Sequence, residues 1–123
     1  MAKQKITFAP QVLDLTLYAG DGDGFRMTIT DPLGAPIPLT GTMRAQIRTT
    51  REAPDPPSAV FDIDMSEGAQ GVVNLKVPAD QTQNLVTDTD SFSGVWDLEW
   101  TAEGEDPLTI CQGNVECLRD VSR

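Results

Sequence analysis

The sequence predicts an all-β fold: an antiparallel, immunoglobulin-like β-sandwich of about seven to eight short strands with one short helical turn. Two observations predict it. Apolar side chains recur with a period of two along short segments, which is typical of strands with one buried face. Turn-forming residues separate these segments at fairly regular intervals, as they do in antiparallel sandwiches.

Six segments show this alternation. In each one, alternate residues are apolar and are expected to face the core, as Trp96, Leu98 and Trp100 do in the last. The six segments are residues 13–18 (LDLTLY), 25–30 (FRMTIT), 43–48 (MRAQIR), 61–65 (FDIDM), 73–77 (VNLKV) and 95–100 (VWDLEW).

The connections follow from glycine and proline. Residues 31–36 (DPLGAP) predict a turn, and residues 66–71 and 102–107 (SEGAQG and AEGEDP) predict hairpin connections. Residues 52–58 (EAPDPPS) hold three prolines, so we expect an exposed loop outside any sheet ladder. Residues 78–86 (PADQTQNLV) begin with proline and predict the one short helix.

The last segment, residues 108–121 (LTICQGNVECLRDV), is long for one strand. Gly113 in its middle predicts a bulge that bends the strand, so that its second half pairs elsewhere. Cys111 and Cys117 would lie about 20 Å apart on one continuous strand, at about 3.3 Å per residue. A disulfide needs Cα atoms within about 7 Å, which only a hairpin at Gly113 would allow. We expect reduced, half-buried packing residues.

A chain of 123 residues provides one domain. We expect an N-terminal arm over residues 1–11 and a single sandwich domain over residues 12–123. The first residues have no apolar signal region and no apolar run is long enough for a membrane span. The sequence therefore predicts a protein kept in aqueous solution, with no membrane partner.

Charge and composition exclude several function classes. The net charge is −10, and no Lys or Arg occurs between Lys76 and Arg119, so we expect no nucleic-acid partner. Solubility explains this charge, and docking on a basic surface is the alternative. The absence of histidine excludes Ser-His-Asp and Cys-His catalysis and histidine-bound zinc.

The run D-G-D-G at residues 21–24 raises the possibility of a calcium loop. An EF-hand loop counted from Asp21 fails at its fifth and twelfth positions, which are Phe25 and Pro32. A turn that needs glycine explains the run better. We therefore expect no metal site, no cofactor and no catalytic residue.

Arg44, Arg48 and Arg51 form the one basic cluster in the sequence and are the candidate partner contact. A solvated face balanced by acidic neighbours is the alternative. The arm adds Lys3 and Lys5, and its Ile-Thr-Phe stretch could pair with a neighbouring protein.

Trp96 and Trp100 share one strand face and are expected to fill the core. Sugar stacking on Trp100 is the alternative. Asp97 and Glu99 point to the other face, and neighbours on one flat strand do not make a glycosidase cleft.

The order of several phrases resembles the small β-sandwich modules of tailed-bacteriophage particles. These phrases are residues 31–48 (DPLGAPIPLTGTMRAQIR), 77–85 (VPADQTQNL), 94–100 (GVWDLEW) and the closing stretch 108–123 (LTICQGNVECLRDVSR). In that family, phrases of the kind G-x-P-x-x-L-T-G, a W-D-L-E strand and a closing G-x-V-x-x-x-x-D-V-T-R occur in this order. This chain departs from it in Ser122 and in its two cysteines.

The resemblance implies a non-enzymatic virion structural protein, assembled in the host cytoplasm, that decorates the capsid or joins tail or fibre components. Its partners would be other virion proteins, in a homo-oligomer or a lattice. Asp97 and Asp120 would anchor turns or strand ends. A carbohydrate-binding or host-adhesion module is the alternative function.

Overall fold

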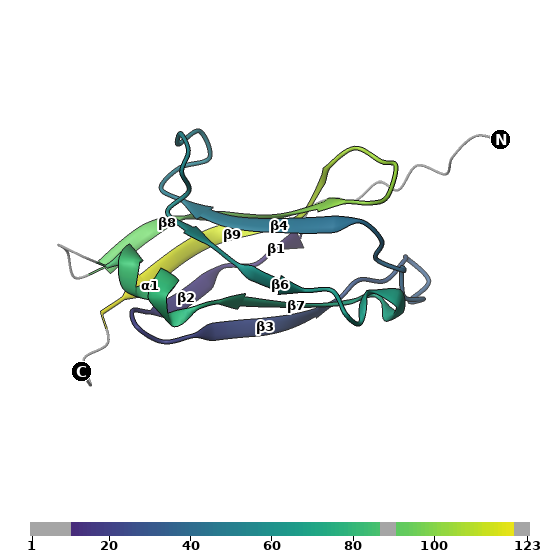
Figure 1. Ribbon diagram of the computed structural model, residues 1–123, viewed down its shortest axis with the longest axis horizontal. Helices are drawn as coiled ribbons and strands as arrows, with labels where there is room; N and C mark the ends of the chain where they lie inside the picture. Colours follow the sequence, from purple (N-terminus) through teal and green to yellow (C-terminus); the bar gives the residue numbers. More distant parts are fainter. Residues whose placement is uncertain (1–10, 87–90, 120–123) are drawn as a thin grey trace.

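A computed structural model describes residues 11–86 and 91–119 of the chain. Two β-sheets face each other and enclose the core, which confirms the prediction of an all-β sandwich (Figure 1). Residues 1–10, with Lys3 and Lys5, lie outside the described residues, as does Asp120. Gln11, which the sequence assigned to the arm, is the first residue of a strand.

The larger sheet has the strand order β1/β2–β9–β8–β4–β5, and the smaller sheet has the order β3–β7–β6. An immunoglobulin sandwich is divided in the same way, with its strands B, E and D in one sheet and its strands C, F and G in the other. Here β3, β7 and β6 take the places of B, E and D, and β4, β8 and β9 take the places of C, F and G. The larger sheet contains β1 (Gln11–Val12), β2 (Leu15–Tyr18), β4 (Thr42–Arg48), β5 (Ala59–Val60), β8 (Ser91–Thr101) and β9 (Leu108–Leu118), and the smaller one β3 (Asp23–Thr28), β6 (Asp62–Asp64) and β7 (Val72–Val77).

The prediction of a purely antiparallel sandwich is wrong at one edge. Strands β1 and β2 both run parallel to β9, while the other strand pairs are antiparallel. The tight turn after Tyr18 sends the chain into β3 of the opposite sheet. Strand β2 lies at the outer edge of the larger sheet, opposite β3 of the smaller sheet (Figure 1). In that position it runs in the same direction as β9.

The described residues hold nine strands, more than the seven to eight expected, because two short strands, β1 and β5, precede the predicted segments 13–18 and 61–65. Residues 59–64 change sheets at Phe61: β5 pairs with β4, and β6 pairs with β7. The Phe61 N–H donates to the Ala45 carbonyl over 3.0 Å. The Phe61 ring lies between the layers, with its centroid 5.4 Å from that of Trp96 and 6.3 Å from that of Phe25.

The first strand is divided at Leu13 and Asp14 by an exchange of hydrogen bonds. A regular parallel ladder would have the Asn114 N–H donate to the Leu13 carbonyl. Instead it donates to Asp14 Oδ1 over 2.9 Å. The Leu13 carbonyl is thereby free to accept from the buried indole nitrogen of Trp96, over 2.7 Å.

Gly113 makes this exchange possible, and the predicted bulge at Gly113 is wrong. The irregularity in the β8–β9 ladder lies between Leu98 and Glu99, where Ile110 is the extra residue. A Cβ atom on Gly113 would collide with the carbonyl group of Leu13. The glycine therefore serves a close approach of two backbones, and the two halves of β9 do pair with different strands, β1 and β2.

The predicted short helix is α1 (Ala79–Leu85), with Pro78 as the residue that precedes it. Its Thr82 is fully buried. The Thr82 hydroxyl donates to the Asp21 carbonyl over 2.8 Å and accepts from the Gly20 N–H over 3.1 Å. The helix thus holds the turn between β2 and β3. The predicted hairpin at residues 66–71 joins β6 to β7 and contains the 3-10 helix η1 (Gly68–Gln70).

Both cysteines are free and lie in the core. Cys111 and Cys117 are almost fully buried, not half-buried as expected, because they point inward from the strand that β8 and the first strands enclose. Burial raises the pKa of both thiols, which makes them poor nucleophiles. In the part of the chain that the structure describes, no helix is long and apolar enough to cross a bilayer.

Replacing Thr82 with valine keeps the shape of the side chain and removes its hydroxyl. We expect a loss of about 2 kcal/mol of unfolding free energy, because the partly buried Gly20 N–H and Asp21 carbonyl each lose a hydrogen bond to the Thr82 hydroxyl. Chemical denaturation monitored by tryptophan fluorescence measures this loss. Thr28→Val, at an exposed threonine on β3, is the control, and an equal effect of both substitutions would contradict the assigned role.

Gly113→Ala should destabilise the protein by about 1–3 kcal/mol, because the added methyl group has no room beside Leu13. The matched control is Gly22→Ala, whose methyl group would come nearest to the flexible end of Lys76, at 3.2 Å, and otherwise makes ordinary contacts. Thermal unfolding of the two variants gives the comparison. If Gly113→Ala unfolds at the temperature of the parent protein, the close approach is not a constraint on the fold.

Candidate functional site

The three arginines singled out by the sequence surround one hollow on the outer face of the larger sheet. The hollow has a volume of about 240 Å³, and we call it the arginine hollow. Strands β4, β8 and β9 and the loop after β4 supply its walls. It is lined by Arg44, Gln46, Arg48, Arg51, Val95, Trp96, Asp97, Thr109 and Gln112.

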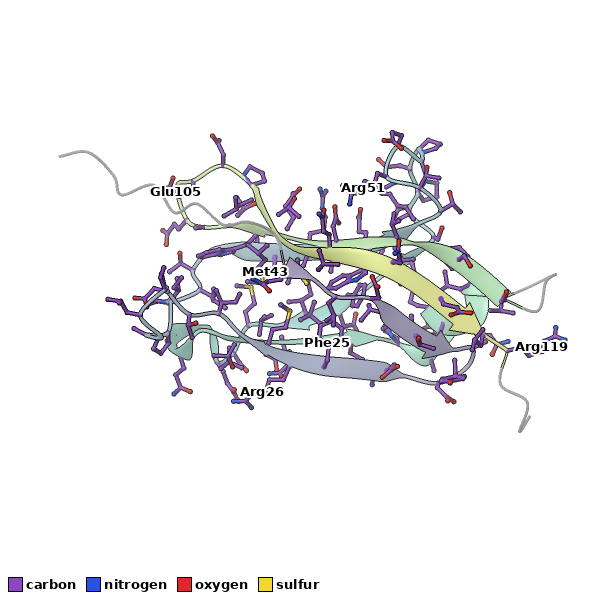
Figure 2. The ribbon with its side chains drawn as sticks, turned by 180° about the vertical axis from the view of Figure 1, so that it is seen from behind. Phe25, Arg26, Met43, Arg51, Glu105 and Arg119 are labelled. Atoms are coloured by element: carbon purple, nitrogen blue, oxygen red, sulfur yellow. The ribbon has the colours of Figure 1, made fainter. Side chains whose placement is uncertain are left out.

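Two loops stand above this face. They are the β4–β5 loop and the β8–β9 loop, and they rise from the same side of the larger sheet (Figure 1). Arg51 lies on the first loop and Glu105 on the second, both on the outer side of the sheet (Figure 2). A partner that reached the arginine hollow would therefore lie between two loops of the protein.

Arg44 is the most open of the strand arginines in the hollow. Its Nη2 lies 3.1 Å from Glu99 Oε1 on β8, and 63% of its side chain is exposed. Exposed ion pairs of this kind contribute at most about 1 kcal/mol. A partner carboxylate can therefore compete for this guanidinium at little cost.

Arg48 has a different role, because it holds the proline-rich loop. Its guanidinium donates to the Ala53 carbonyl over 3.0 Å, to Gln46 Oε1 over 2.9 Å and to Asp55 Oδ1 over 2.5 Å. The bond from Arg48 lowers the pKa of the Asp55 carboxyl group. The loop is exposed, as predicted, and Arg48 fixes its position over the hollow.

Arg51 and Asp97 are the charges in the hollow that stay unmatched. Within residues 11–86 and 91–119, neither side chain forms an ion pair. Burial in the hollow raises the pKa of Asp97, and the nearby Glu99 raises it further, while the three arginines act in the opposite direction. Among the described residues, the hollow therefore offers one guanidinium group without an ion pair, that of Arg51, and one carboxylate whose charged form is disfavoured by burial.

The position of Asp97 corrects one expectation. Asp97 lies in the middle of β8, paired with Gln46 on one side and Gln112 on the other. It therefore anchors neither a turn nor a strand end. Its outward direction was predicted correctly, but its place in a hollow depends on β9 and on the β4–β5 loop, which are far from it in sequence.

The D-G-D-G run begins within the turn between β2 and β3, as predicted. The Asp21 N–H donates to the Tyr18 carbonyl over 3.0 Å, and the left-handed residue is Gly20, with φ of 85°. Among the described residues, no group of three or more acidic or cysteine side chains is placed to hold a metal ion.

Both tryptophans belong to the core, which confirms the preferred interpretation. Trp96 and Trp100 are 2% and 3% exposed. The indole nitrogen of Trp100 donates to the Thr40 carbonyl over 2.7 Å. Trp100 therefore provides no surface on which a sugar ring could stack.

Asp97→Asn should raise the melting temperature at pH 7. The folded state raises the pKa of Asp97, so the folded protein binds the proton more tightly and loses stability as pH rises through this pKa. Removing the charge removes that cost. The gain should disappear below the ordinary pKa of 3.8, where Asp97 is protonated in both states.

Asp64→Asn is the matched control and should act in the opposite direction. The Ser66 N–H donates to Asp64 Oδ1 over 2.8 Å and lowers the pKa of Asp64. Its stabilising effect is present above pH 3.8 and is lost as pH falls through the folded pKa. Melting curves between pH 3 and pH 7 test both variants, and a lower melting temperature for Asp97→Asn at pH 7 would contradict the analysis.

Comparison with known proteins identifies no family for this chain. No protein-family model matches it, and no curated protein matches it at a significant level. A function has to be argued from the arginine hollow and from the order of sequence phrases described above.

Proposed function

We propose that this chain is a non-enzymatic structural protein of a tailed-bacteriophage particle. It is an accessory β-sandwich that decorates the capsid or joins tail or fibre components through protein–protein contacts. Its partners are other virion proteins, and it works in a homo-oligomer or a lattice. The observation that supports this most is the arginine hollow, an open, polar depression on a sheet face between two raised loops.

The hollow has the properties of a protein contact. Arginine is enriched at interfaces because its planar guanidinium forms paired hydrogen bonds with carboxylates and carbonyl groups. Arg51 is available for such a bond, and Arg44 gives up only an exposed ion pair. Arg48 holds the adjacent loop in place before a partner arrives, which lowers the entropic cost of binding.

The charge distribution supports an oriented contact. The chain has nine basic and 19 acidic residues, and three of the nine basic residues line this one hollow. The remaining acidic surface repels other acidic surfaces. An acidic partner segment is therefore attracted to the arginine face and repelled elsewhere, which fixes orientation more than it adds affinity.

Quantitative mass spectrometry of purified particles from the source tests the proposal. A copy number near parity with the major shell protein, or a simple fraction of it, would indicate capsid decoration. A copy number lower by orders of magnitude would indicate a tail or fibre position. Absence of the chain from particles would contradict the proposal.

Arg51→Glu should lower incorporation into particles about tenfold, the change expected from a loss of about 1.4 kcal/mol of binding free energy. Arg26→Glu is the matched control: Arg26 is an exposed arginine on the opposite sheet and pairs with Glu67 over 3.1 Å. Competition between each variant and the parent chain during assembly gives the ratio. Equal incorporation of both variants would exclude the arginine hollow as the contact.

A further inference from the structure

Among residues 11–86 and 91–119, the edge of the larger sheet formed by β1 and β2 has less of the protection that the other edges carry. At the opposite edge, the Val60 N–H of β5 donates to Gln81 Oε1 of α1 over 3.1 Å. In the smaller sheet, exposed charges lie on both edge strands: Asp62 and Asp64 on β6, and Arg26 on β3. Charges and covering groups of this kind normally prevent sheet edges from pairing with other chains.

The β1–β2 edge carries a single charged side chain, which is exposed. Asp14 is the one charged residue between Gln11 and Tyr18, and its Oδ1 is occupied by the Asn114 N–H of β9. The remaining exposed side chains are largely apolar. Val12, Leu13 and Tyr18 are 73%, 40% and 45% exposed, and they are three of the five large apolar residues exposed in the described part of the chain.

The backbone of this edge is also available. The N–H groups of Leu13 and Ala19 donate to β9, to the carbonyls of Gln112 and Leu118 over 2.9 and 2.8 Å. Because successive residues of a strand direct their backbone groups to opposite sides, Thr16 and Tyr18 direct their N–H groups away from β9. Those groups face the open edge.

We propose that the β1–β2 edge pairs with the same edge of a second copy of this chain, antiparallel and about a two-fold axis. A two-fold axis lets one patch serve both partners, and antiparallel pairing places the Val12 end of one edge beside the Tyr18 end of the other. Each chain carries a net charge of −10, so two copies approach most easily where few acidic side chains project. The β1–β2 edge carries one, Asp14, whose Oδ1 already accepts a hydrogen bond from Asn114.

This contact is distinct from a contact through the arginine hollow, and the salt dependence of dimer formation distinguishes the two. Screening of the repulsion between two acidic chains should strengthen an edge-to-edge dimer as salt rises. A dimer formed by ion pairs between Arg51 and Asp97 of facing copies would weaken instead. The inference does not rest on the virion role, since self-association in solution and presence in particles are measured separately.

Sedimentation velocity of the full chain, from low micromolar to submillimolar concentration and at low and high salt, tests the proposal. We expect a dimer that forms with concentration and is favoured by salt. Val12→Lys and Tyr18→Lys should each weaken it about tenfold or more, because each places a charged side chain against an apolar residue of the second copy, Tyr18 or Val12. Leu33→Lys, at an apolar residue that is 94% exposed in a turn elsewhere, should leave it unchanged.

A backbone variant completes the test. Thr16→Pro removes one N–H group that faces the open edge and leaves the ladder to β9 intact, a position that tolerates proline. It should also weaken the dimer. A parent chain that stays monomeric under all conditions would overturn the proposal, as would a dimer that survives the Val12 and Tyr18 substitutions or that Arg51→Glu and high salt dissolve.

Discussion

The hydrogen bond between the indole of Trp96 and the carbonyl of Leu13 determines much of the arrangement around it. A buried indole N–H must find an acceptor, since leaving it unpaired costs about 1–3 kcal/mol. The acceptor here is a main-chain carbonyl that a regular parallel ladder would have used for Asn114. Asp14 replaces that carbonyl as the partner of Asn114, and Gly113 leaves the space that the exchange needs. The division of the first strand and the hydrogen bond of the core tryptophan are thus parts of one exchange.

On the outer face of the larger sheet, several charged side chains pair with one another within the protein. Glu99 and Asp55 balance two of its three arginines, so most of the local charge is used to hold strands and a loop in place. Among the described residues, the remaining arginine and aspartate of the hollow, Arg51 and Asp97, form no ion pair. In a strongly acidic chain, such a balanced face is where contact with another protein meets least repulsion. The face is formed by side chains that the period-two pattern directs outward, so its polarity costs the core nothing.

The sequence predicted the individual strands far better than it predicted which strands pair and in which direction. Alternation identified the inward residues of β4 and β8 correctly, because one-sided burial leaves a local signal that each segment carries by itself. It did not reveal the direction of β1 and β2, because a period of two is the same in parallel and antiparallel strands. The sequence marks Gly113 as unusual, but a β-bulge and a close approach of two backbones both favour glycine. Only the segment opposite, which is about a hundred residues away, distinguishes them. The arginine hollow has the same origin. Its residues Arg44, Arg48 and Asp97 are locally predictable as outward-facing, but the hollow exists only where β9 and the β4–β5 loop come together.

The parallel pairing of β1 and β2 with β9 also has a consequence for how the chain folds. Strand β9 lies between the first strands and β8, so the last strand in sequence occupies an interior position of the larger sheet. The smaller sheet, by contrast, is complete once residue 77 has been made. During synthesis, the nascent chain can therefore form β3, β6 and β7 early. One edge of β8 stays unpaired until β9 has been made. Contacts of such long sequence separation are the ones that slow folding in β proteins. The larger sheet can therefore be completed only after nearly the entire described chain has been synthesised.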